Sequence, residues 1–195
     1  MKKKKAAPIV TVRLIDKALD IHIKILTSIR QSKINAIKSG TTEIFNTAGI
    51  QVNMIFEKLS GPQFKEFEIV EVEARCPMNN PSEDIRVMAQ ELRNAPNNII
   101  VAFICKMVNI VGMNGIVAGC SSFPNEGPTT VIAVGIPSKY LLAHEIGHLL
   151  GLDHVSDNDQ LMTSEGTGNF TSTPPKLIDS EIEKLRENNL LQNLP

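Results

Sequence analysis

The chain has 195 residues, of which 42% are hydrophobic and 21% charged, and its formal net charge is −1. This length suffices for one domain with a sizeable core, and the apolar content excludes a disordered chain. No apolar run reaches the ~18 residues that a membrane-spanning helix needs. The nearly neutral charge argues against the broad basic surface of a nucleic-acid binder. We therefore expect neither a transmembrane segment nor a nucleic-acid partner.

Strand and helix patterns mix along the whole chain. Strands are expected at Ile9–Ile15, Ile50–Phe56, Phe67–Val72, Asn98–Cys105, Gly115–Ser121 and Thr129–Gly135. Helices are expected at Ile29–Ala48, Ser82–Arg93, Ser138–Leu150 and Asp179–Leu191. The strands show short apolar or alternating runs, whereas the helices repeat apolar residues every three to four positions. This mixture predicts an α/β or α+β class.

The N-terminus is basic, with Lys2–Lys5 holding four of the 20 basic residues. The following Ala6–Val12 is short and contains Pro8, unlike the apolar core of a secretory signal. We interpret this stretch as a solvated tail, the alternative being a weak electrostatic contact with a membrane or nucleic acid. The absence of a signal predicts a cytoplasmic protein or the processed form of a secreted one.

Three cysteines at irregular spacing do not form a disulfide framework. Cys105 ends an apolar run and is expected in the core. Cys120 either pairs with Cys76 or stays free. Cys76 is interpreted as a structural or disulfide-bonded residue.

The segment that indicates chemistry reads HEIGHLLGLDH, from residue 144 to residue 154. His144 and His148 are four residues apart on a predicted helix, so both imidazoles project from one face and can bind one zinc ion. Glu145 follows the first ligand, where its carboxylate can take a proton from water activated by the metal. Gly151 permits a left-handed turn that returns His154 as a third ligand.

This motif resembles the extended zinc signature of the metzincin metallopeptidases. Met162, eight residues after His154, fits the methionine of their Met-turn at a spacing similar to that of matrixins. The resemblance implies a zincin-like fold: a twisted, mixed five-stranded sheet with a backing helix and an active-site helix. It also implies one catalytic domain over residues 1–195, with subdomains at about 8–154 and 155–195. The second subdomain would contain the Met-turn and one helix.

The resemblance also assigns roles. His144, His148 and His154 would bind one catalytic zinc, and Glu145 would be the general base. Met162 would form a hydrophobic floor under the metal. Two further parts would bind the substrate: Val117 and Ala118 on an antiparallel edge strand, and residues 163–175 as a pocket wall.

These features predict a zinc-dependent endopeptidase that acts on a peptide or protein, and we expect a monomer. Two alternatives remain open: a non-catalytic binding module stabilised by zinc, and a protease effector or toxin with one narrow target. The short acidic loop with Asp157 and Asp159 offers few of the 6–8 oxygen ligands that calcium prefers, so calcium is not supported.

Overall fold

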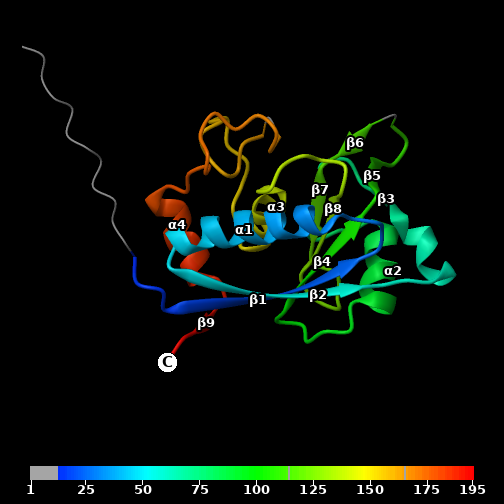
Figure 1. The fold of residues 1–195 in the computed structure, drawn as a ribbon, viewed down its shortest axis with the longest axis horizontal. Coiled ribbons are helices and arrows are strands. Elements are labelled where there is room, and N and C mark those ends of the chain that lie inside the picture. The colour runs from blue at the N-terminus through cyan, green and yellow to red at the C-terminus, as the bar shows by residue number, and fades with distance from the viewer. Residues whose placement is uncertain (1–12, 114, 165) are drawn as a thin grey trace, which may run out of the picture.

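The computed structural model describes residues 13–113, 115–164 and 166–195 (Figure 1). The helices are α1 (Gln31–Thr47), α2 (Glu83–Leu92), α3 (Leu141–Leu149), α4 (Asp179–Glu187) and the 3-10 helix η1 (Pro62–Glu68). The strands are β1 (Lys17–Ile25), β2 (Ile50–Lys58), β3 (Ile69–Val72), β4 (Ile100–Cys105), β5 (Met107–Ile110), β6 (Ile116–Val117), β7 (Gly119–Ser122), β8 (Thr129–Ala133) and β9 (Gln192–Asn193). The predicted mixed α/β class is confirmed.

The main sheet is mixed and has the strand order β2-β1-β4-β8-β7. Strands β1, β2, β4 and β8 are parallel, and β7 is antiparallel to β8 at one edge. This path has five strands, the number that the resemblance implies. A sixth strand, β9, pairs antiparallel with Lys17 and Ala18 of β1, before the part of β1 that pairs with β4.

The sheet separates two apolar clusters, and β4 contributes to both. All its residues are buried, which explains why its sequence is apolar throughout. Ile100, Ala102 and Ile104 pack with α1 and α3 on one face. Val101 and Phe103 pack with α2 on the other, where Ser82 caps the helix by accepting from the amide of Ile85. The site described below lies on the α3 side (Figure 1).

The prediction of the first strand was wrong. Residues 9–12 lie outside the described part, and residues 13–15 are not in a strand. The strand is β1, where polar side chains alternate with Leu19, Ile21, Ile23 and Ile25, all buried in the core. Leu14 in the expected strand is 80% exposed. The apolar content of residues 9–15 alone therefore misled the prediction. Whether a segment forms a strand also depends on pairing with adjacent strands, and β1 pairs with both β2 and β4.

The strand expected at Gly115–Ser121 is two strands that belong to different sheets. β6 pairs with β5 in the smaller sheet β3-β5-β6, whereas β7 pairs with β8. Ala118 lies between them, and its carbonyl accepts a hydrogen bond from the amide of Ala133. The chain thus changes from pairing with β5 to pairing with β8 within one short apolar run. The spacing of apolar residues in the sequence cannot reveal such a change.

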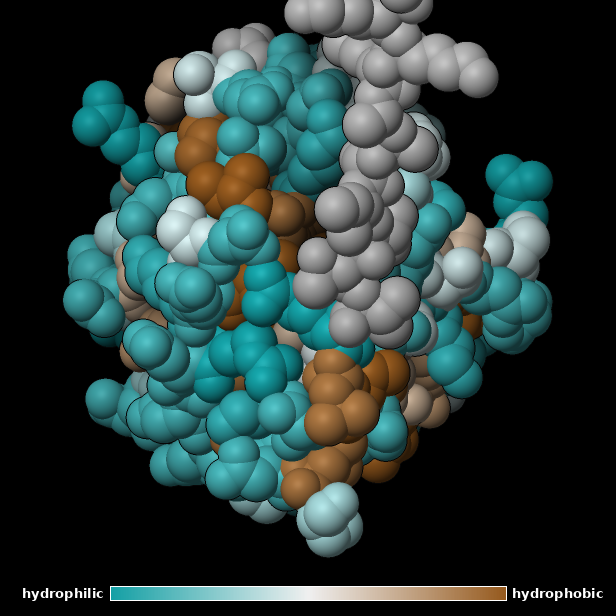
Figure 2. Space-filling view, turned by 90° about the vertical axis from the view of Figure 1, so that its left-hand side faces the viewer, coloured by the Kyte–Doolittle hydropathy of each residue, from teal (hydrophilic) through white to brown (hydrophobic). Residues whose placement is uncertain are grey.

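The C-terminal helix α4 is shorter than expected, since it ends at Glu187. Arg186 near its end donates to both carboxylate oxygens of Asp16, at 2.6 and 2.8 Å, and to the carbonyl of Ala48. These contacts join the C-terminal helix to the start of the main sheet. Figure 2 shows the end of the molecule where α4 and β9 lie, a mainly hydrophilic surface with separate hydrophobic areas. In the described part, no helix is long and apolar enough to cross a membrane.

Candidate functional site

Helix α3 carries the first two histidines of the motif. Its sequence is apolar around most of its surface, so the helix is almost entirely buried between the sheet and α1. His144 and His148 are one turn apart, and their ring centroids are 4.9 Å from each other. The helix therefore presents two imidazoles on the same side.

The chain then turns back and brings in the third histidine. Gly151 has a φ of 93°, a conformation that side chains rarely adopt, and its amide donates to the carbonyl of His148. His154 Nε2 lies 3.2 Å from His144 Nε2 and 3.1 Å from His148 Nε2. Within the described ranges, these three residues form the only group of His, Cys, Asp or Glu side chains placed to hold a metal ion.

Hydrogen bonds at the outer nitrogens determine which ring nitrogens face the centre of the triad. His144 Nδ1 lies 2.7 Å from the carbonyl oxygen of Leu161, and His148 Nδ1 lies 3.0 Å from that of Leu152. A carbonyl can only accept, so each Nδ1 carries the proton and each Nε2 presents a lone pair. Burial lowers the pKa of His144 to about 4, which keeps it neutral at physiological pH.

This donor set fits zinc. The ligand atoms of the three histidines lie within 4.8 Å of one another, so one cation can contact all three. Three histidine ligands with a fourth position left open are a typical donor set of catalytic zinc, and carbonyl bonds to the outer nitrogens of such ligands orient them. The arrangement therefore suits a transition metal that accepts nitrogen ligands.

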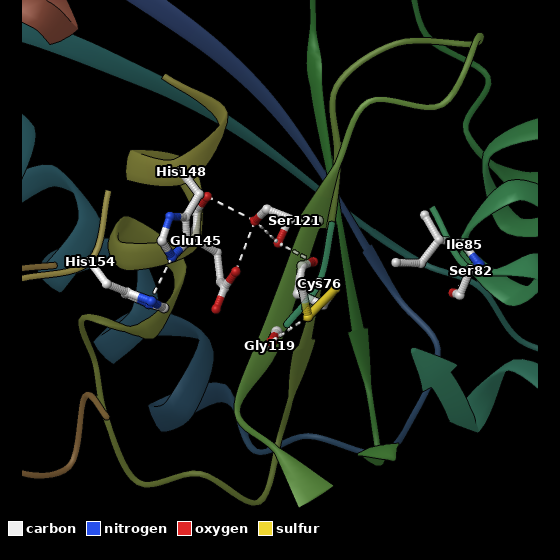
Figure 3. The surroundings of a disulfide bond; sticks show 10 residues. Cys76, Ser82, Ile85, Gly119, Ser121, Glu145, His148 and His154 are labelled. Carbon is white, nitrogen blue, oxygen red and sulfur yellow. Dashed lines mark hydrogen bonds between the residues drawn. A yellow bond between two sulfur atoms is a disulfide. The ribbon is translucent and has the colours of Figure 1, made fainter. Parts of the chain in front are cut away.

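Glu145 lies on the same helix and points toward β7 (Figure 3). Its carboxylate Oε2 accepts a hydrogen bond from Ser121 Oγ at 2.8 Å. Burial raises the pKa of Glu145 to about 7, against the smaller opposing effect of the Ser121 hydrogen bond. A carboxyl group with a pKa near neutrality is suited to accept and return a proton.

Strand β7 contributes two residues that the sequence analysis missed. Ser121 holds one carboxylate oxygen of Glu145. Gly119 leaves room for the other: a Cβ at this position would lie 2.7 Å from Oε1. The signal was the sequence Gly-Cys-Ser within the expected strand, but nothing in the sequence indicated that its alternate residues face α3.

Val117 and Ala118 line the cavity at the triad, but their backbone groups are engaged. Val117 pairs with Val108 of β5, and the carbonyl of Ala118 is bonded to Ala133. In an antiparallel pair, alternate residues direct their backbone groups to opposite edges. The free edge of β7 therefore belongs to Gly119 and Ser121.

Met162 lies in the segment that follows the third histidine, and it is fully buried. A Cβ on Gly147 of α3 would lie 2.6 Å from Met162 Sδ, so the methionine packs directly against this helix. The carbonyl of Met162 accepts from the amide of Val155. These contacts hold the segment with His154 against α3.

A cavity of about 390 Å³ opens beside the triad. Thr163, Ser164, Gly166 and Thr167 form part of its wall, as expected of residues 163–175. The acidic loop nearby is held by protein groups, because Asp159 pairs with Lys176 at 2.8 Å. Tyr140 is directed elsewhere, and its hydroxyl lies 3.1 Å from Glu43 on α1.

Of the two alternatives for Cys120, the structure contains the pair with Cys76. This disulfide attaches the segment before α2 to β7, on the strand face opposite Glu145 (Figure 3). Cys105 is free and buried, and burial raises the pKa of its thiol to about 12, so it is expected to be unreactive.

Reduction of the Cys76–Cys120 disulfide is expected to lower the free energy of unfolding by about 2–4 kcal/mol. The bridge spans a sequence separation of 44 residues, so its loss frees a long loop in the unfolded chain. Urea unfolding of the oxidised and reduced protein measures the difference. Cys105→Ala is the control, and equal midpoints for the oxidised and reduced protein would contradict the expectation.

The comparisons with known proteins agree with this geometry. The sequence model of the matrixin family matches residues 130–179, which include the triad, Glu145 and Met162. Metalloproteinase-II from Bacteroides fragilis has a similar fold, with a TM-score of 0.62 at 16% identity over 89% of this chain. Archaemetzincin from Methanopyrus kandleri has a TM-score of 0.54 at 18% identity over 88% of this chain. The chain is metzincin-like in motif and fold.

The metzincin-like chain spans 53% of the Bacteroides structure and 95% of the archaemetzincin structure. Comparison with curated proteins gives no sequence match. The family match includes the three histidines that could hold a metal ion. Strand β7 precedes the matched residues, so the contacts that Gly119 and Ser121 make with Glu145 are observations on the structure itself.

Proposed function

We propose that the protein is a zinc-dependent endopeptidase. The convergence of the Nε2 atoms of His144 and His148 on His154 Nε2, at 3.2 and 3.1 Å, carries this proposal. His144, His148 and His154 hold one zinc ion, and the adjacent Glu145 is the general base. A purely structural zinc would have four protein ligands and no use for a carboxylate beside them.

The residues of the chain divide the reaction between them. His144, His148 and His154 would hold the zinc ion, which would supply Lewis acidity toward the substrate carbonyl and water. Glu145 accepts the proton of the attacking water and returns it to the leaving amine. Gly119 and Ser121 offer free backbone groups at the edge of β7, to which an extended peptide can add as a further strand. Edge pairing orients the scissile bond relative to Glu145.

The proposal is tested by incubating zinc-loaded protein with a proteome-derived peptide library and identifying new termini by mass spectrometry. We expect cuts within peptides that a zinc chelator abolishes. Protein treated with chelator and reloaded with zinc is the control, because cleavage should return with the metal. An absence of cuts by zinc-loaded protein, on this library and on casein, would contradict a broad endopeptidase. It would favour a binding module or an effector with one narrow target.

A further inference from the structure

We propose that Ser121 is a positioning residue, which holds the carboxylate of Glu145 in the orientation needed to take a proton. This inference rests on the proposed function of Glu145 as the general base. It concerns a residue on strand β7, 24 positions away in sequence, that binds the base directly.

Alternate residues of β7 face opposite sides of the sheet, and this places Ser121 and Gly119 together. Both face α3 (Figure 3), whereas Cys120 between them belongs to the apolar cluster on the α2 side and is bonded to Cys76. Ser121 Oγ contacts Oε2 of Glu145, and the missing side chain of Gly119 accommodates Oε1. One strand therefore binds Oε2 and leaves the space that Oε1 needs.

The hydroxyl of Ser121 has more acceptors than it can serve at once. Oε2 of Glu145, the backbone oxygen of Glu145 and Thr130 Oγ1 lie at 2.8, 2.9 and 3.0 Å. Thr130 donates its own proton to the carbonyl of Cys120 at 3.0 Å, so it can accept from Ser121. A charged carboxylate is the strongest of these acceptors and takes the bond.

The strand that carries Ser121 is itself fixed. β8 pairs with β7 along one edge, and the disulfide holds Cys120 from the face opposite Glu145. The amide of Phe123 donates to the carbonyl of Met78 at 2.8 Å, just beyond the strand. A hydroxyl on a strand held at these points can restrict the carboxylate more than one on a loop could.

The chain offers a matched control in the next residue. Ser122 is also buried on β7, but its Oγ has no hydrogen-bond partner. Ser121→Ala and Ser122→Ala therefore remove the same atom from adjacent positions, and only the first removes a contact with Glu145. Ser121→Thr keeps a hydroxyl and serves as the rescue variant.

We expect Ser121→Ala to lower kcat by about 10- to 100-fold, as loss of a supporting partner typically does. KM should stay within about 2-fold, since the backbone of β7 is retained. Zinc content and the melting temperature are measured on the same samples. Ser122→Ala should match the wild type in kcat, and Ser121→Thr should recover part of the loss.

Crystal structures of the metal-free variants give a second readout that does not depend on activity. In Ser121→Ala the Glu145 side chain should turn or occupy several rotamers, whereas in Ser122→Ala it should not. An unchanged kcat and an unchanged Glu145 rotamer in Ser121→Ala would overturn the inference, as would an equal loss of kcat in Ser122→Ala. A wild-type protein that cleaves no peptide would instead contradict the proposed function, and the rotamer comparison would still decide whether Ser121 holds Glu145.

Discussion

Replacement of Glu145 by glutamine is expected to lower kcat for peptide cleavage by about 10²- to 10⁴-fold, the usual contribution of general acid–base catalysis. Glutamine keeps the size of the side chain and can still accept the bond that Ser121 donates at 2.8 Å. It cannot accept a proton from water. The zinc content should equal that of the wild type, because the three ligand nitrogens are unchanged.

The measurement combines steady-state kinetics with metal analysis of the same preparation. Glu43→Gln is a matched control, since this glutamate binds Lys139 and Tyr140 away from the triad. A Glu145→Gln protein that cleaves at a rate near the wild type would refute its role as base. A variant that lost both zinc and activity would instead indicate that Glu145 supports the metal site.

The local part of the site could be predicted from the sequence because it follows from helix geometry. A four-residue spacing places His144 and His148 on one side of any helix. Glycine at position 151 then allows the turn that returns His154, and its φ of 93° agrees. These relations extend over 11 residues, so no knowledge of the sheet was needed.

The contacts across the sheet could not be predicted in this way. Ser121 reaches Glu145 only because β7 adds antiparallel to the parallel strands and because the side-chain alternation of β7 happens to point that residue at α3. A shift of one residue in register would direct Ser122 to this position instead. The sequence Gly-Cys-Ser-Ser contains both serines, and no local rule chooses between them.

The substrate-binding residues expected on the edge strand were equally hard to predict from the sequence. The resemblance placed Val117 and Ala118 at the free edge, but the change of partners at Ala118 makes its carbonyl an acceptor for Ala133. The backbone groups of Gly119 and Ser121 are directed to the edge of β7 away from β8, and their side-chain positions face Glu145. In the proposed function, one short strand therefore presents its edge to the substrate and its face to Glu145.

Replacement of His154 by alanine is expected to weaken zinc binding by more than about 100-fold. Loss of an outer partner of a ligand typically costs 10- to 100-fold, and loss of a ligand should cost more. His154 Nε2 lies 3.2 Å from His144 Nε2 and 3.1 Å from His148 Nε2. Without it, His144 and His148 remain as a two-nitrogen site on α3.

Competition with a chelator of known affinity measures the change, and thermal unfolding gives an independent check. Zinc at about 100-fold its Kd stabilises a protein by about 2.7 kcal/mol, so added zinc should raise the melting temperature of the wild type more than that of His154→Ala. His22→Ala is the control, because this remaining histidine lies on β1 and is not part of the triad. Equal zinc affinities for the wild type and His154→Ala would contradict a site of three histidines. Because α3 would be intact in both proteins, such a result would assign the metal to His144 and His148 alone. The turn at Gly151 would then have no role in metal binding.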